Sequence, residues 1–215
     1  MTEELELSRQ IEAKLVALNP RHMKLMSMTL ETGYCLRAAK LLRNAEGNII
    51  IGTGFPVEDT FETDGPVGAM ALYRAMEKMG CTPWIASEPI LKTALEQDYR
   101  TIELTIDDAQ NAEASAHEIL AKFKPNLVLS IERPGRTKDG NYYNMRSEKI
   151  NSEVAVFDPF IELSKCPTIC IGDGGNEIGM GNLYSSLKDL QINASITKCD
   201  ELVISDVSNW AAYGI

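Results

Sequence analysis

The chain lacks the features of a nucleic-acid-binding, membrane-spanning or disulfide-stabilised protein. No run of basic residues interrupts a balance of 21 Lys and Arg against 31 Asp and Glu, and the net charge of −10 would repel a nucleic acid. No apolar run approaches the roughly 18 residues that a membrane span requires. The five cysteines are an odd number and widely scattered, which favours a reduced compartment over a disulfide framework.

The N-terminal segment likewise lacks a basic region, an apolar stretch and an arginine-rich pattern, so no secretory signal or transit peptide is predicted. We therefore expect a cytoplasmic protein, with neither a nucleic acid nor a membrane as its partner. The acidic excess also constrains any site for an acidic metabolite. Such a site must gain positive charge locally from arginine, a metal ion or a helix N-terminus.

Helical and strand patterns alternate along the sequence, which predicts an α/β fold. This alternation implies right-handed crossovers and a mostly parallel sheet with helices on both faces. We predict a single α/β domain over residues 1–215, a three-layer, Rossmann-like sandwich in which two leading helices (1–46) precede the core (47–215). The expected helices are 4–18, 24–43, 65–80, 89–97, 109–123 and 147–165, and the expected strands are 48–55, 82–87, 100–106, 126–131, 166–172 and 201–205.

Three unusual polar loops directly follow three of the predicted strands. TGFPVEDTFETDGPVGA follows the first strand, ERPGRTKDGNYYN follows the fourth, and GDGGNEIGMG follows the fifth. In sheets of this kind, ligands bind beyond the carboxyl ends of the strands. If the three strands are neighbours, the three loops line one crevice, and we expect the functional site there.

The glycine-rich loop IGDGGNEIGMGN (171–182) fails the two common phosphate-binding patterns. A dinucleotide fingerprint would need glycine where Glu177 or Tyr184 stands. A P-loop would need Lys and then Ser or Thr where Met180 and Gly181 stand. We therefore expect neither a nucleotide nor an organic cofactor.

The same loop displays Asp173, Asn176 and Glu177 in front of a predicted helix. Free N–H groups at a helix N-terminus favour an anion, whereas the two carboxylates favour a cation. A loop that offers both suits a metal-bridged acidic substrate. The alternative is a tight strand-to-helix turn in which the Asp and Asn side chains only cap the helix.

The other two loops allow similar pairs of interpretations. Arg133 and Arg136 flank a rigid Pro-Gly turn, and their guanidinium groups match carboxylates, although loop arginines are often only solvated. The following DGNYYN (139–144) is a candidate lid. In ETDGPVGA (62–69), Thr63 or Asp64 can cap a helix that has proline in its first turn, and a cap needs no further function.

The acidic side chains of these loops suit Mg²⁺ or Mn²⁺ rather than zinc, because these ions prefer oxygen ligands. A bound metal and a metal-free site remain equal alternatives on the sequence. The candidate ligands are Glu62, Asp64, Glu132, Asp173 and Glu177.

Taken together with VSNWAAYGI (207–215), the three loops resemble the D-glutamate cyclase family, which includes bacterial members classed as a domain of unknown function. The resemblance spans about residues 53–215, and ERPGR with GDGGNEIGMG is its most specific part. It implies a lyase that converts D-glutamate to 5-oxo-D-proline and water. The positions that match the family motifs are Glu62, Asp64, Gly65, Glu132, Arg133, Gly135, Arg136, Asp173, Gly174, Gly175, Asn176, Glu177, Ser208, Asn209 and Trp210.

The implied reaction assigns expected roles to these residues. Asp173, Glu177 and Asp64 are the catalytic candidates, with Glu177 or Asp64 as the general base toward the amine. A metal ion on Asp173 and Glu177 would help to stabilise the oxyanion. The expected substrate-binding residues are Glu132, Arg133, Arg136, Gly174, Gly175, Asn176, Ser208 and Asn209.

Two other functions stay open on the sequence: a divalent-metal-dependent phosphoester hydrolase, and a non-catalytic module that binds a small acid. Family members are expected to continue past the SNW segment, so the core is either short at its C-terminus or lacks C-terminal helices. The sequence also leaves the metal, the stereospecificity and the oligomeric state open, with a homo-oligomer among the options.

Overall fold

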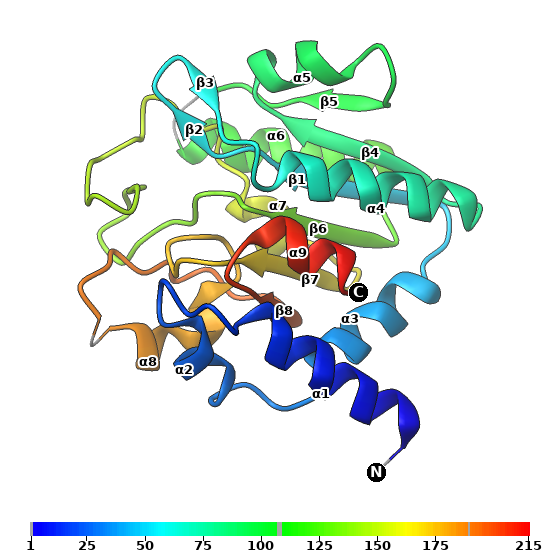
Figure 1. Cartoon of the computed structure of the whole chain (residues 1–215). Coiled ribbons are helices and arrows are strands. Elements are labelled where there is room, and N and C mark those ends of the chain that lie inside the picture. Colours follow the sequence, from blue (N-terminus) through cyan, green and yellow to red (C-terminus); the bar gives the residue numbers. More distant parts are fainter. Residues whose placement is uncertain (1, 107–108, 189) are drawn as a thin grey trace.

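A six-stranded parallel sheet forms the centre of the computed structural model, which describes residues 2–106, 109–188 and 190–215 (Figure 1). The strand order is β5-β4-β1-β6-β7-β8, and every pairing in this sheet is parallel. The strands are β1 (Asn48–Thr53), β4 (Thr82–Ser87), β5 (Thr101–Glu103), β6 (Leu127–Ile131), β7 (Thr168–Gly172) and β8 (Glu201–Ile204). The inner strands are apolar and buried, as parallel strands covered on both faces must be.

Helices cover both faces of this sheet, which confirms the predicted α/β sandwich. Helices α4 (Pro66–Lys78) and α9 (Ser208–Tyr213) pack on one face, while α6 (Ala109–Phe123) and α7 (Asp158–Glu162) lie on the other (Figure 1). Helix α5 (Pro89–Leu95) lies beside β4 and β5. In the part of the chain that the structure describes, no helix combines the length and the apolar character needed to cross a bilayer.

The N-terminal helices pack at the β8 edge of the sheet. Helix α1 (Glu3–Leu15) lies against α3 (Tyr34–Arg43), which contacts β8. The helix predicted over 24–43 is wrong as a continuous element, because the chain forms a short α2 (Met23–Ser27) and restarts at α3. The buried carboxylate of Glu12 accepts the N–H groups of Gly33 and Cys35 (3.2 and 3.1 Å), so it caps α3 from outside the helix.

The helix predicted over 147–165 is also wrong, since only α7 forms there and residues 154–157 are buried but belong to neither a helix nor a strand. Tertiary contacts occupy the backbone groups that such a helix would use. The N–H of Ala155 donates to Glu88 (3.1 Å), and its carbonyl accepts from Arg133. A long-range ion pair thus overrides the local preference.

The remaining differences concern short elements beside the crevice. A small antiparallel hairpin, β2 (Pro56–Val57) and β3 (Thr60–Phe61), was not predicted. The helix expected behind the glycine loop is a 3₁₀ turn, η1 (Met180–Leu183), followed by α8 (Tyr184–Leu187). The strand predicted over 100–106 is reduced to β5, and residues 107–108, just before the predicted 109–123 helix, lie outside the described residues.

Candidate functional site

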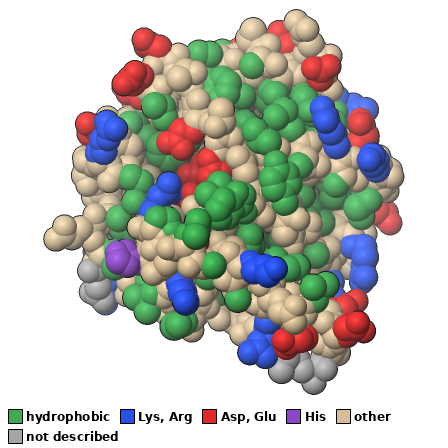
Figure 2. Space-filling view, viewed as in Figure 1, with side chains coloured by type: hydrophobic (Ala, Val, Ile, Leu, Met, Phe, Trp, Pro, Cys, Tyr) green, Lys and Arg blue, Asp and Glu red, His purple; other side chains and the backbone are tan. Residues whose placement is uncertain are grey.

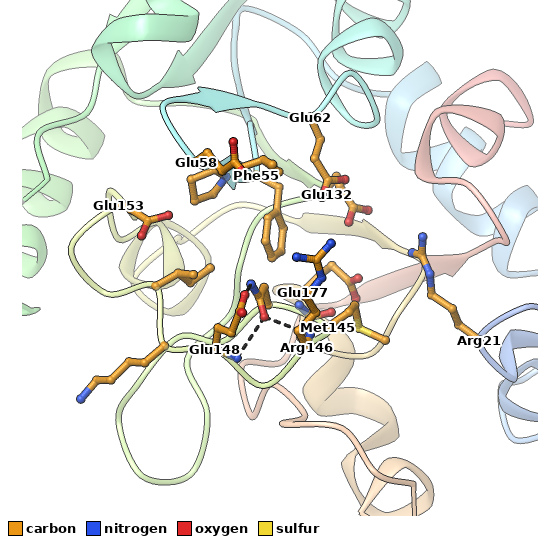
Figure 3. A pocket seen from close by; sticks show the side chains of 16 residues that line it. Arg21, Phe55, Glu58, Glu62, Glu132, Met145, Arg146, Glu148, Glu153 and Glu177 are labelled. Carbon is orange, nitrogen blue, oxygen red and sulfur yellow. Dashed lines mark hydrogen bonds between the residues drawn. The ribbon is translucent and has the colours of Figure 1, made fainter.

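The three polar loops come together at one edge of the sheet. Strands β1, β6 and β7 are neighbours, which is the condition that the sequence left open, so their following loops meet beyond the carboxyl ends of the strands. A pocket of about 630 Å³ lies there (Figure 3). Its lining comprises Arg21, Phe55, Pro56, Val57, Glu58, Glu62, Glu132, Asn144, Met145, Arg146, Glu148, Lys149, Ile150, Glu153, Asn176 and Glu177.

The floor of this pocket is acidic: Glu132 and Glu177 line it, and Asp64 and Asp173, which do not belong to the described lining, lie beside Glu132. Asp64, Glu132 and Asp173 each offer an oxygen, and these oxygens lie within 4.8 Å of one another. Glu177 lies near enough to raise the pKa of both Glu132 and Asp173. We call these four residues the acid cluster. Figure 2 shows acidic side chains gathered near the middle of this face, next to a basic one. The cluster contains four of the five predicted metal ligands, and the fifth, Glu62, lines the pocket.

Glu132 takes its place at the end of β6 in an uncommon backbone conformation. Its φ is +49°, a left-handed value that costs free energy in a residue other than glycine. The neighbouring Gly65, with φ +94°, allows the chain before α4 to come close, because a Cβ at this position would lie 2.6 Å from the Glu132 Cβ. The close approach at Gly65 brings the preceding residue, Asp64, next to Glu132.

Ser208 and Asn209, at the start of α9, form hydrogen bonds with two members of the acid cluster, Asp64 and Glu132. The Asp64 carboxylate accepts the N–H groups of Ser208 (3.0 Å) and Asn209 (2.7 Å), and so caps α9. In return, Asn209 Oδ1 accepts the N–H groups of Gly65 (3.0 Å) and Gly68 (2.7 Å) at the start of α4. The Ser208 hydroxyl donates to Glu132. Ser208 and Asn209, predicted to bind substrate, thus contact the acid cluster and the helix ends in this structure.

Glu177 closes the glycine loop on itself. Its carboxylate accepts the N–H groups of Gly174 (2.9 Å) and Gly175 (2.7 Å), so these two predicted substrate-binding groups are occupied within the loop. Asn176 lines the pocket and donates from Nδ2 to the Tyr143 carbonyl (3.0 Å). Its Oδ1 atom is buried and, within the described residues, has no hydrogen-bond partner, which leaves it available to a donor on a ligand.

Burial favours the neutral forms of Glu132, Asp173 and Glu177, and repulsion between carboxylates adds to this effect at Glu132 and Asp173. Burial, Glu177 and Asp64 raise the pKa of Asp173 to about 9, although Arg21 opposes the rise. Burial, together with Asp173 and Glu177, raises the pKa of Glu132 well above its ordinary value. Burial also raises the pKa of Glu177, against the opposing effect of the N–H groups that it accepts. A cation that enters the site would relieve this repulsion.

The donor set fits a hard divalent cation such as Mg²⁺ or Mn²⁺. Three carboxylate oxygens converge, and the Oδ2 atom of Asp173 is buried and lacks a hydrogen-bond partner among the described residues. Such an unsatisfied oxygen is costly unless a ligand completes it. Asp64, Glu132 and Asp173 are therefore the residues that would hold the ion.

Arg21 is a site residue that the sequence did not reveal. It lies in the turn between α1 and α2, and its guanidinium donates to Asp173, 152 residues away in the sequence. Burial lowers the pKa of Arg21, but Asp173, Glu132 and Glu177 outweigh this effect and raise it. Figure 3 shows Arg21 reaching the pocket from the side opposite Glu153. Arg21 is a single arginine between two helices, and no sequence motif around it could have identified it as a site residue.

The two arginines predicted to bind carboxylates contact protein groups instead. Arg133 is fully buried and donates to Glu88 (2.6 Å) and to the carbonyls of Thr53 and Ala155. Arg136 pairs with Glu162 (2.6 Å) near the surface. Neither belongs to the pocket lining described above. Direct binding of substrate by these arginines stays a prediction.

Residues 144–153, which we call the wall segment, form one side of the pocket. The candidate lid (139–144) ends where this segment begins, so only its last residue, Asn144, belongs to the lining. Asn144 Oδ1 accepts the N–H groups of Arg146 (2.9 Å) and Glu148 (3.0 Å), and its Nδ2 donates to the Glu148 carboxylate (2.6 Å). These bonds fix the turn that carries Arg146.

Comparisons with known proteins agree with the motif resemblance. A sequence model of the family described as "D-glutamate cyclase-like, C-terminal" matches residues 13–215 of the chain. A human protein named "D-glutamate cyclase, mitochondrial" is 33% identical over 207 residues, which cover 84% of this chain and 33% of the human protein. The chain thus spans about a third of the length of this relative.

Two solved structures are similar at a lower level. A glycosyltransferase from Rickettsia africae has a TM-score of 0.42 and 14% identity, covering 74% of this chain and 42% of its own. An uncharacterised protein from Mycobacterium paratuberculosis has a TM-score of 0.37 and 14% identity, and the match covers 80% of this chain and 59% of that protein's chain. Similarities this weak support no conclusion about the fold or function of this chain.

Proposed function

Because the chain belongs to the D-glutamate cyclase-like family, we propose that it is a lyase that cyclises D-glutamate to 5-oxo-D-proline and water. The observation that carries this proposal is the acid cluster at the floor of the pocket, with the buried, unsatisfied Oδ2 atom of Asp173. The human relative is named for this activity, but it is a protein of which the chain covers only 33%. The activity of this chain therefore has to be measured directly.

The reaction forms one C–N bond and breaks one C–O bond. The α-ammonium group loses one proton before its nitrogen attacks the γ-carboxylate carbon, and a second as the amide forms. The departing oxygen takes up two protons and leaves as water, so the overall reaction consumes no proton. Because a carboxylate is a poor electrophile until its charge is offset, the site must supply positive charge and a group that passes protons.

We assign proton transfer to Glu177. Its side chain lines the pocket, and the N–H groups of Gly174 and Gly175 hold its carboxylate in place. Burial raises its pKa, although the accepted hydrogen bonds oppose this rise, and a raised pKa favours proton uptake by a carboxylate. Glu177 would accept a proton from the ammonium group and return it to the departing oxygen.

We assign charge compensation to the other three carboxylates. Asp64, Glu132 and Asp173 would hold Mg²⁺ or Mn²⁺, which supplies Lewis acidity toward a carboxylate when bound. Arg21 adds a positive charge beside them. Much of the remaining rate enhancement would come from holding the amine and the carboxylate together, because the reaction is intramolecular.

The test is incubation with D-glutamate or L-glutamate, with and without Mg²⁺ or Mn²⁺ and with EDTA, followed by chromatography for 5-oxoproline. We expect product from D-glutamate, and less of it after EDTA. Glu177→Gln should lower kcat by about 100-fold or more, since general acid–base groups contribute at least this much. Glu113→Gln, an exposed change on α6, is the matched control. Absence of product under every condition would contradict the proposal.

The two other functions give different results in parallel assays. A metal-dependent phosphoester hydrolase would release phosphate from a panel of phosphoesters in the presence of Mn²⁺. A non-catalytic module would be stabilised thermally by D-glutamate without any turnover. Either outcome would replace the lyase assignment.

A further inference from the structure

We propose that Arg146 on the wall segment binds the α-carboxylate of the substrate and so selects an acidic amino acid. This inference rests on the proposed function, since it assumes a substrate with two carboxylates. The γ-carboxylate must lie over the acid cluster, where its carbon is attacked. The α-carboxylate carries a second negative charge, so it needs a positive partner of its own away from the γ-carboxylate.

Few basic side chains are available for this task. Within the described lining, the basic residues are Arg21, Arg146 and Lys149. Arg21 already donates to Asp173 and lies beside the γ-carboxylate position. In the described structure, neither Arg146 nor Lys149 forms an ion pair, so the charge of either one is available to a ligand.

The geometry of the wall segment favours Arg146 over Lys149. The backbone N–H of Arg146 is fixed by Asn144 (2.9 Å), so the turn that carries its side chain is preorganised. The preceding Met145 packs on the glycine loop, since a Cβ on Gly174 would lie 2.9 Å from its sulfur. Figure 3 shows Arg146 beside Met145 and Glu177, on the side of the pocket opposite Glu62. A guanidinium also binds a carboxylate through two parallel hydrogen bonds, which an ammonium cannot match.

The experiment compares Arg146→Ala with Lys149→Ala on two substrates. D-glutamate carries both carboxylates, whereas its α-amide, D-isoglutamine, keeps only the γ-carboxylate. We expect Arg146→Ala to raise KM for D-glutamate by about 10- to 100-fold with little change in kcat, as loss of a charged hydrogen-bonded contact does. KM for the α-amide should change by less than about 3-fold, because that substrate lacks the group that Arg146 binds. Arg146→Lys should show a smaller rise in KM for D-glutamate than Arg146→Ala. Lys149→Ala should have a KM close to that of the parent protein.

The inference fails if Arg146→Ala leaves KM for D-glutamate unchanged. It also fails if Arg146→Ala raises KM equally for both substrates, or if Arg146→Ala and Lys149→Ala raise KM for D-glutamate equally. A binding measurement separates this failure from that of the proposed function. Thermal stabilisation of the full chain by D-glutamate should be lost in Arg146→Ala even if the parent protein shows no turnover. Stabilisation that persists in this variant would overturn the assignment of Arg146. Absence of 5-oxoproline from the parent protein would overturn the lyase assignment alone.

Discussion

Glu132 and Arg133 are consecutive in the chain and both are buried, yet they stand in opposite electrostatic surroundings. Arg133 has a carboxylate partner, Glu88, and carbonyl acceptors around it, and its guanidinium lies over the Phe157 ring. Glu132 lies beside further carboxyl groups and, among the described residues, accepts a hydrogen bond from the Ser208 hydroxyl. We call the first arrangement the Arg133 clamp.

The difference separates a structural charge from a functional one. A buried charge that is paired with an opposite charge holds segments together, and the two terminal nitrogens of Arg133 join the ends of β1 and β6 to Glu88 and residue 155. A buried charge without compensation costs stability and persists where a ligand or a reaction uses it. Breaking each region should therefore change stability in opposite directions.

The largest expected effect is loss of the Arg133 clamp. Arg133→Ala leaves Glu88 buried without its partner, which should lower the free energy of unfolding by about 3–5 kcal/mol. Urea denaturation measures this change. If Arg133→Ala does not fold, Glu88→Gln can replace it, and this variant should lose less stability. The matched control is Arg136→Ala, whose surface pair with Glu162 should contribute about 0–1 kcal/mol. A loss below that range for Arg133→Ala would show that the clamp is not structural.

The acid cluster should respond in the opposite way. At pH 8 the Asp173 carboxyl group must take up a proton on folding, whereas an asparagine at this position is neutral in both states and keeps an oxygen that can accept from Arg21. Asp173→Asn should therefore stabilise the metal-free protein at pH 8 by about 1–2 kcal/mol while abolishing turnover. The folded-state pKa of Asp173, about 9, lies above its unfolded value, so its neutral form stabilises the fold at low pH. That contribution is lost as the pH rises toward 9.

The pH dependence distinguishes this explanation from a general effect of the substitution. The stability difference between Asp173→Asn and the parent protein should grow from pH 5 to pH 8 in denaturation curves recorded with EDTA. Mn²⁺ should stabilise the parent protein and have less effect on the variant. A variant that is less stable than the parent protein at pH 8 would contradict the charge repulsion inferred for the acid cluster.

The same comparison explains which parts of the molecule the sequence predicts. The strands and the three polar loops follow from local patterns, and the loops meet because β1, β6 and β7 are neighbours. Asp64, Glu132 and Asp173 were predicted to lie together because the acidic residues of the three polar loops are visible in the sequence, and the structure brings them together, whereas their role as metal ligands stays a prediction. Local patterns therefore predicted most of the sheet and the floor of the pocket.

The sequence fails where a long-range contact decides the outcome. ERPGR contains two arginines that the sequence alone cannot distinguish. The fold shows that Arg133 pairs with Glu88 and that Arg136 pairs with Glu162. Residues 154–157 are apolar enough for a buried helix, yet the clamp takes the backbone groups of Ala155. Arg21 contributes to the site only because the N-terminal helices pack at the β8 edge. Such pairings depend on tertiary structure, which no local pattern encodes.

The smallest expected effect concerns the contact that joins the acid cluster to the C-terminal helix. Asn209→Ala removes the side chain that caps α4, which should cost about 1 kcal/mol of stability. Because Asp64 accepts the backbone N–H of residue 209, the variant keeps that hydrogen bond, and Asp64 should stay in the cluster. Thermal unfolding and the 5-oxoproline assay together test this separation of roles. A stability loss with unchanged kcat would assign Asn209 to capping alone, whereas a loss of activity without a change in unfolding temperature would show that its side chain acts on the substrate.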